Sequence, residues 1–161
     1  MSPKTIVLSL VGILVVTFGA IWLITRNQTP EIVPDANVFS KVEVVGSVTA
    51  DLGEMKVKDV GTKDFVIKNV GTNPLQITSV SSSCNCTVGQ IVYQGKISRE
   101  YGMHAPGGFV NQIAVGDTAV VRVIYKPYIM PVYGPVTRDV YIGTNDPDNP
   151  RLTFTVKTVV K

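Results

Sequence analysis

Apolar residues follow two different patterns along the chain. Near the N-terminus they form an almost unbroken run, whereas beyond about residue 60 they alternate with polar residues in short stretches. A run of about 20 apolar residues is typical of a membrane-spanning helix, and alternation with a period of two is typical of a strand with one buried face. The pattern therefore predicts a helical segment followed by a β-rich domain.

The apolar run covers residues 5–25 and contains no charged residue. A helix of that length is about 31 Å long and matches a hydrocarbon core of about 30 Å. A secretory signal peptide has an apolar region of only about 7–15 residues and ends at a cleavage site with small residues, which residues 24–28 do not offer. We expect an uncleaved transmembrane helix that acts as a signal anchor, with a cleaved signal peptide as the alternative.

The residues that flank this run predict the orientation of the helix in the membrane and the linker that follows it. Lys4 precedes the helix and Arg26 follows it, so the positive-inside bias is slight. We expect a single-pass protein of the cell membrane, with the tail 1–4 inside and the C-terminal domain extracytoplasmic. Residues 26–41 are expected to form a linker because Pro30 and Pro34 disfavour helix.

The alternating stretches lie within residues 42–161 and are separated by Gly, Pro, Asn and Asp. The apolar residues predicted to share a buried face within each stretch are Phe65 and Ile67, Leu75 and Ile77, Val121, Val123 and Tyr125, Val140 and Ile142, and Leu152, Phe154 and Val156. Antiparallel sheets with one wet face show this pattern, and frequent turn residues are typical of all-β sandwiches. We predict an all-β antiparallel sandwich of seven to nine strands.

A more specific pattern begins at residue 51. Leu52-Gly53 is followed by Phe-Val-Ile-Lys-Asn-Val-Gly-Thr-Asn-Pro-Leu-Gln-Ile at 65–77, by Ser-Cys-Asn-Cys-Thr at 83–87 and by Thr-Asn-Asp at 144–146. This order resembles an uncharacterised family of exported bacterial immunoglobulin-like domains, related to the Hydin-like, ASH-type domains of ciliary and centrosomal proteins. The resemblance implies an immunoglobulin-like sandwich outside the cytoplasm and supplies no reaction. The chain departs from it at Asn85, where the family has Gly, and in the long connection that follows.

Cys84 and Cys86 are the most chemically suggestive pair. In a strand, such residues share a face and their Cα atoms lie about 6.6 Å apart, at the upper limit for a disulfide, so a bridge needs a local bend. Val80, Ser82 and Val88 have the same parity, which favours two buried structural thiols on a small apolar face.

Two alternatives to buried thiols stay open. One is a disulfide, and the other is a soft metal site for Cu(I), with Met103 and His104 as additional ligands. His104 is the only histidine, and nothing in the sequence marks a third group that would orient it in a catalytic Cys–His pair. Asp146 and Asp148 have the oxygen ligands that Ca²⁺ prefers, but their sequence is first a turn. Common catalytic motifs are absent, so we expect no enzyme.

The segment 89–112 is the feature that the fold explains least. Long connections are often functional, and this one carries our candidate protein-binding residues, Gly95, Tyr101, Gly107, Gly108 and Phe109. Without Lys4 and Arg26 the chain has 13 Lys and Arg against 12 Asp and Glu, which gives no electrostatic footprint for nucleic acid. We expect a non-catalytic module for protein binding or scaffolding at the cell envelope, with Cu(I) or thiol-redox handling as the alternative.

Overall fold

A computed structural model describes residues 17–19 and 39–161 of the chain. The predicted tail 1–4, most of the predicted membrane helix 5–25 and nearly all of the linker 26–41 lie outside the described residues. Residues 17–19 are helical. Within the described part of the chain, no helix has the length and apolar character needed to cross a membrane. The N-terminal anchor stays a prediction.

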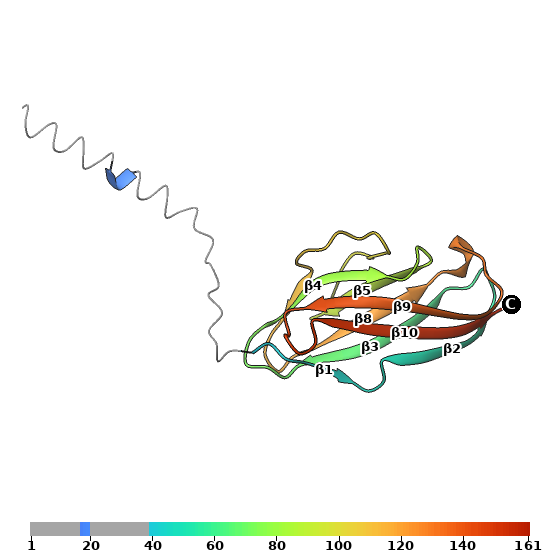
Figure 1. Ribbon diagram of the computed structural model, residues 1–161, viewed down its shortest axis with the longest axis horizontal. Helices are drawn as coiled ribbons and strands as arrows, with labels where there is room; N and C mark the ends of the chain where they lie inside the picture. The colour runs from blue at the N-terminus through green and yellow to red at the C-terminus, as the bar shows by residue number, and fades with distance from the viewer. Residues whose placement is uncertain (1–16, 20–38) are drawn as a thin grey trace, which may run out of the picture. The chain divides into compact units, whose positions relative to one another are not determined.

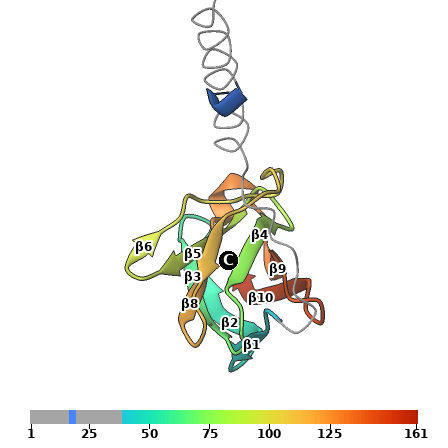
Figure 2. The same ribbon diagram turned by 90° about the vertical axis from the view of Figure 1, so that its left-hand side faces the viewer.

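Residues 42–160 form two five-stranded sheets that pack face to face (Figures 1 and 2). The first sheet has the order β1 (Val42–Val45), β3 (Gly61–Asn69), β8 (Thr118–Tyr125), β5 (Thr87–Tyr93) and β6 (Lys96–Ile97). The second has the order β2 (Thr49–Met55), β10 (Arg151–Val160), β9 (Gly134–Thr144), β4 (Leu75–Ser82) and β7 (Asn111–Ile113). The predicted all-β sandwich is confirmed, with ten strands instead of seven to nine because β6 and β7 are only two and three residues long.

One strand pair departs from the predicted antiparallel arrangement. β2 lies parallel to β10, whereas every other pair in the two sheets is antiparallel. The chain changes sheets between β1 and β2, at Gly46, whose φ of 94° is in the left-handed region that glycine adopts without strain. Alternation within a strand identifies its buried face and not the direction of its neighbour, so the sequence pattern could not reveal this pair.

The core between the sheets consists of the side chains that alternation placed on inner faces. Of the twelve predicted residues, eleven are buried, and Leu152 is partly buried against the main cluster. The rings of Phe65 and Phe154 meet across the two sheets with centroids 5.0 Å apart. The predicted faces are confirmed, and burial of these aliphatic and aromatic side chains is the main term that stabilises the fold.

The sandwich has two ends that differ in composition. The entry end is where residues 39–41 join β1, and the far end carries the C-terminus and the connections after β4 and β8 (Figure 1). A second, smaller apolar cluster fills the far end; it contains Met55, Cys86, Tyr125, Val136 and Val160, with Leu52, Val57 and Cys84 packed against it.

Polar contacts hold the entry end together. The Asp146 carboxylate is buried and accepts hydrogen bonds from the Val42 amide at 2.9 Å, the Asp148 amide at 2.9 Å and the Asn149 side chain at 3.1 Å. Burial alone would raise the pKa of Asp146, but these hydrogen bonds outweigh it and hold that pKa below its usual range. Because its oxygens face N–H donors from Val42, Asp148 and Asn149, Asp146 fixes the start of β1, in agreement with the expectation that this sequence is first a turn.

Motif residues of the first sheet complete the same end. The Asn69 side chain donates to the carbonyls of Asn73 and Ile113 and accepts from the Gly71 amide at 3.0 Å. A Cβ on Gly71 would lie 2.4 Å from the Phe39 carbonyl oxygen, so only glycine fits against the incoming chain there. The Asn-x-Gly motif therefore has a structural role, closing the turn after β3.

Candidate functional site

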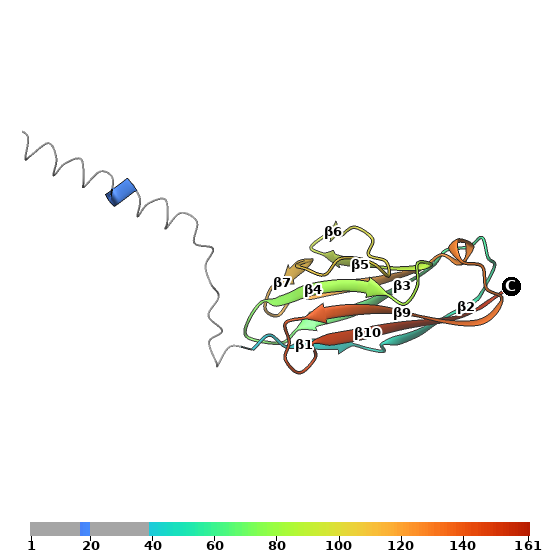
Figure 3. The same ribbon diagram turned by 45° about the horizontal axis from the view of Figure 1, so that its top comes forward.

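The 89–112 segment is mostly part of the sandwich. It begins inside β5, a strand that pairs with β8, and the backbone of Gly89 exchanges hydrogen bonds of 2.9 Å with Tyr101. Between these points the chain turns at Gln94 and Gly95, both with positive φ. The rest of the segment reaches β7 on the other sheet and covers this side of the sandwich (Figure 3).

The five candidate binding residues in this segment have different surroundings. Tyr101 is only 8% exposed and packs in the main core, so it is not available to a partner. Gly95 is exposed in the β5–β6 turn, and Gly107, Gly108 and Phe109 are exposed in the connection to β7. These four exposed residues do not line a common pocket. The sequence could not distinguish Tyr101 from the four exposed residues, because its pattern of apolar and polar residues gives no sign that Tyr101 pairs with Gly89.

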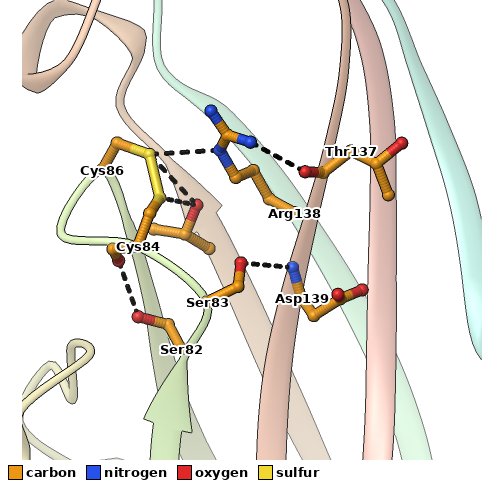
Figure 4. Close-up of a disulfide and its surroundings, with 8 residues drawn as sticks. Ser82, Ser83, Cys84, Cys86, Thr137, Arg138 and Asp139 are labelled. Carbon is orange, nitrogen blue, oxygen red and sulfur yellow. Dashed lines mark hydrogen bonds between the residues drawn. A yellow bond between two sulfur atoms is a disulfide. The ribbon is translucent and has the colours of Figure 1, made fainter.

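The two cysteines are joined in a disulfide, with a Cα–Cα distance of 5.3 Å (Figure 4). The favoured prediction of two buried thiols is therefore wrong for this structure, and the disulfide alternative is the one observed. The parity argument failed because residues 80–88 are not one strand. The chain bends at residues 83–86 and continues as β5 in the opposite sheet, where odd-numbered positions face the core.

The two sulfurs have unequal environments. Cys86 is fully buried, whereas Cys84 is partly exposed. The Nε of Arg138, on β9, donates to Cys86 Sγ at 3.2 Å, and its guanidinium also donates to the Thr137 carbonyl at 2.9 Å. The Thr87 Oγ1 lies 3.4 Å from Cys84 Sγ and 3.9 Å from Cys86 Sγ. A disulfide sulfur carries no hydrogen, so in both contacts the hydroxyl is the donor.

Hydrogen bonds from backbone and serine groups fix the disulfide turn to β4, β9 and the end of β8. The Lys126 amide donates to the Cys86 carbonyl at 2.7 Å, which ties the turn to the end of β8. The Asp139 amide donates to Ser83 Oγ at 3.0 Å, and Ser82 Oγ donates to the Cys84 carbonyl at 2.8 Å (Figure 4). The turn is therefore held rigidly against β9, the strand that carries Arg138.

The proposed Cu(I) ligands are not assembled in this structure. The sulfurs are bonded to each other, and thiolate is the form that binds soft metals. Met103 and His104 are exposed in the connection to β7. The described residues contain no group of three or more His, Cys, Asp or Glu side chains able to hold a metal. Cu(I) binding by the reduced protein stays a prediction.

A surface that alternation did not reveal lies between β8 and β9. Residues 128–133 read Tyr-Ile-Met-Pro-Val-Tyr and all six are exposed. They include five of the sixteen large hydrophobic residues that are exposed in the described chain, namely Tyr128, Ile129, Met130, Val132 and Tyr133. We call residues 128–133 the apolar loop. Its signal in the sequence is a run of six residues between two strands, 128–133, whose only polar groups are the tyrosine hydroxyls.

The far end also contains an unpaired polar atom. The Tyr125 hydroxyl is the one buried side-chain nitrogen or oxygen without a hydrogen-bond partner among the residues that the structure describes. The Arg138 guanidinium lies over the ring of Tyr125, 5.8 Å from its centroid. Arg138 therefore contacts both the disulfide and the aromatic ring beneath it.

Comparison with known proteins supports the fold and leaves the activity open. A family described as "Protein of unknown function (DUF1573)" matches residues 44–100. That range includes the disulfide turn and agrees with the resemblance to an uncharacterised family. A search of curated protein sequences found no match.

Three solved structures are similar in fold. A protein of unknown function from Porphyromonas gingivalis is 20% identical with a TM-score of 0.60; the match covers 81% of this chain and 51% of that one, so our chain spans about half its length. The ASH, or PapD-like, domain 7 of human CEP192 is 12% identical with a TM-score of 0.50, covering 84% and 94%. A family 123 glycoside hydrolase from Clostridium perfringens is 11% identical with a TM-score of 0.52, covering 76% and 27%. At these identities the likeness shows an immunoglobulin-like, PapD-like sandwich and nothing about chemistry.

Proposed function

We propose that this protein is a non-catalytic binding module of the cell envelope, which holds a protein partner through the apolar loop. The observation that carries the proposal is the exposure of five large hydrophobic side chains within six consecutive residues. Contiguous apolar surface of this kind marks interaction sites on otherwise soluble domains. Tyr and Met, which supply three of the five side chains, are enriched in protein interfaces.

Backbone hydrogen bonds and prolines restrict the conformation of the apolar loop. Its first half begins with the 3₁₀ turn η1 (Pro127–Ile129), in which the Ile129 amide donates to the Lys126 carbonyl and the Met130 amide donates to the Pro127 carbonyl, both at 3.1 Å. Pro127 is buried and Pro131 restricts the second half. A loop held in this way loses less conformational entropy when it binds, which favours affinity.

A protein fits this surface better than an anionic lipid surface. Adsorption to anionic lipid depends on clustered Lys and Arg beside the apolar residues. The loop has no charged residue, and the adjacent Lys126 is already paired with Glu100 at 2.7 Å. Neutral side chains with tyrosine hydroxyls at their tips suit the centre of a protein interface, where water is excluded.

The location of the loop supports a tethered module. The apolar loop lies at the far end, whereas residues 39–41 join the sandwich at the entry end (Figure 1). The chain therefore enters the sandwich at the end opposite the proposed binding surface. The predicted extracytoplasmic location is part of this proposal and rests on the residues around 5–25.

Substitution of the loop tests the proposal. The full-length chain carrying Tyr128→Ser, Ile129→Ser and Tyr133→Ser is compared with a chain carrying Val45→Ser and Val70→Ser, which are exposed elsewhere. Central apolar anchors contribute about 1–2 kcal/mol each, so the loop variant should reduce partner recovery by more than about tenfold. Recovery is measured by quantitative mass spectrometry after affinity purification, and circular dichroism checks the fold. Equal recovery of the same partner by all three chains would contradict the proposal.

A further inference from the structure

The disulfide differs from a simple structural cross-link in three respects that can be read from its surroundings. It closes a very short loop, since the cysteines are two positions apart. One of its sulfurs belongs to a partly exposed residue and the other to a fully buried one. The buried sulfur accepts a hydrogen bond from a guanidinium. Each of these three features affects how the Cys84–Cys86 disulfide reacts with a thiol.

We infer that Cys84 is a site of S-thiolation, at which a small external thiol opens the Cys84–Cys86 disulfide. The incoming thiolate bonds to Cys84 Sγ while the bond between the two protein sulfurs breaks. Its electron pair leaves on Cys86 Sγ, which becomes a thiolate. One disulfide replaces another, so no oxidant or reductant is consumed, and the proton of the external thiol has gone to water beforehand.

Burial determines which sulfur is attacked. Cys86 is 0% exposed and packs in the apolar cluster at the far end, so an attacking group cannot approach it from solvent. Cys84 lies at the edge of the same cluster and is partly exposed. Because Cys84 is partly buried, a small thiol such as glutathione suits it better than a cysteine in a folded protein.

Arg138 favours departure of the buried sulfur. Thiol–disulfide exchange is faster when the leaving sulfur is more stable as a thiolate. The Arg138 Nε lies 3.2 Å from Cys86 Sγ and is placed to donate to the negative charge that develops there. The Thr87 hydroxyl does not distinguish the two sulfurs, because it lies 3.4 Å from Cys84 Sγ and 3.9 Å from Cys86 Sγ. The guanidinium of Arg138 is therefore the group that favours Cys86 as the leaving sulfur, while the partial exposure of Cys84 makes it the attacked one.

The short length of the loop that the disulfide closes also favours opening of the bond. In the chain-entropy model, a cross-link over so few residues removes little freedom from the unfolded chain and stabilises the fold only weakly. Opening the bond consequently leaves the sandwich folded, since the turn is also held by its hydrogen bonds to β8 and β9. The exchange goes beyond the proposed binding function and does not depend on the apolar loop.

The oxidised full-length chain in mild detergent is incubated with excess reduced glutathione, quenched with acid and alkylated. Mass spectrometry with peptide fragmentation then locates the adducts. We expect glutathione on Cys84 and the alkyl group on Cys86. Adducts mainly on Cys86 would overturn the assignment, as would a rate that increases with urea in parallel with global unfolding, because exchange would then need the unfolded chain.

Variants of Arg138 test its part in the exchange. Arg138→Gln should slow adduct formation by about three- to tenfold, and Arg138→Lys should retain most of the rate because the charge is kept. Arg151→Gln is the matched control; that arginine stacks 4.1 Å from the centroid of the Tyr141 ring on the neighbouring strand. Equal rates for Arg138→Gln and Arg151→Gln would show that the guanidinium does not assist the leaving sulfur.

Discussion

Asp146→Asn changes the buried carboxylate that fixes the start of β1, with almost no change in volume. One oxygen of Asp146 accepts from the Val42 amide and from Asn149, and the other accepts from the Asp148 amide. An asparagine has only one acceptor atom. In its better orientation it keeps the two bonds to Val42 and Asn149 and turns its NH₂ group toward the Asp148 amide, so two donors face each other.

The magnitude follows from these contacts. A hydrogen bond to a charged group contributes about 1.5–3 kcal/mol. The variant loses one such bond, and its other two become neutral and weaker, so we expect the free energy of unfolding to decrease by about 2–4 kcal/mol. Because Asp146 is 1% exposed, solvent does not replace the missing interactions.

The loss of stability caused by Asp146→Asn should become smaller at low pH. The pKa of Asp146 is lower in the folded protein than its usual range, so the ionised carboxylate stabilises the fold. That contribution is complete above the unfolded pKa of about 3.9 and is lost as the pH falls through the folded value. The difference in stability between wild type and variant should therefore be constant near neutral pH and should narrow only below about pH 4.

Urea unfolding of the compact unit Ala36–Lys161 measures both effects. Asp148→Asn is the control, because Asp148 is exposed and contributes only its backbone amide to the turn; its variant should remain within about 0.5 kcal/mol of wild type. Equal stability of Asp146→Asn and wild type, or a difference that widens as the pH falls, would refute the structural role of this carboxylate.

Three further variants test packing at named positions, each by urea unfolding. Gly89→Ala places a Cβ about 2.7 Å from a valine methyl of the opposite sheet and should cost about 1–3 kcal/mol, while Gly107→Ala, which meets nothing within 4 Å, should be neutral. Tyr125→Phe removes an unpaired buried hydroxyl and should leave stability unchanged or raise it by about 1 kcal/mol; a clear loss would reveal a partner for that hydroxyl. Replacing Cys84 and Cys86 by alanine should cost about 1.6 kcal/mol, and a loss above about 4 kcal/mol would contradict a weak cross-link.

The sequence predicted the sandwich because alternation reports burial directly. Phe65 and Ile67 on β3 and Phe154 and Val156 on β10 were assigned to inner faces by parity alone, and all four are buried. The motif order was informative because its polar residues hold turns; the Asn69 side chain, for example, closes the turn after β3.

What the sequence could not predict depends on contacts between distant residues. The parity of residues 80–88 was misleading because the chain bends and changes sheets between Ser82 and Thr87. Arg138 is 52 positions from Cys86, and no local pattern connects them. Tyr101 had the appearance of a loop residue because its pairing with Gly89 is visible only in three dimensions.

The apolar loop as a protein-binding surface is tested most directly by photo-crosslinking in intact cells. A photoreactive amino acid is placed at Ile129 or Tyr133, and at Val70 as the control, since all three are exposed. The account predicts one discrete protein adduct from both loop positions and none from Val70. Adducts to lipid alone, or the same yield at all three positions, would contradict it.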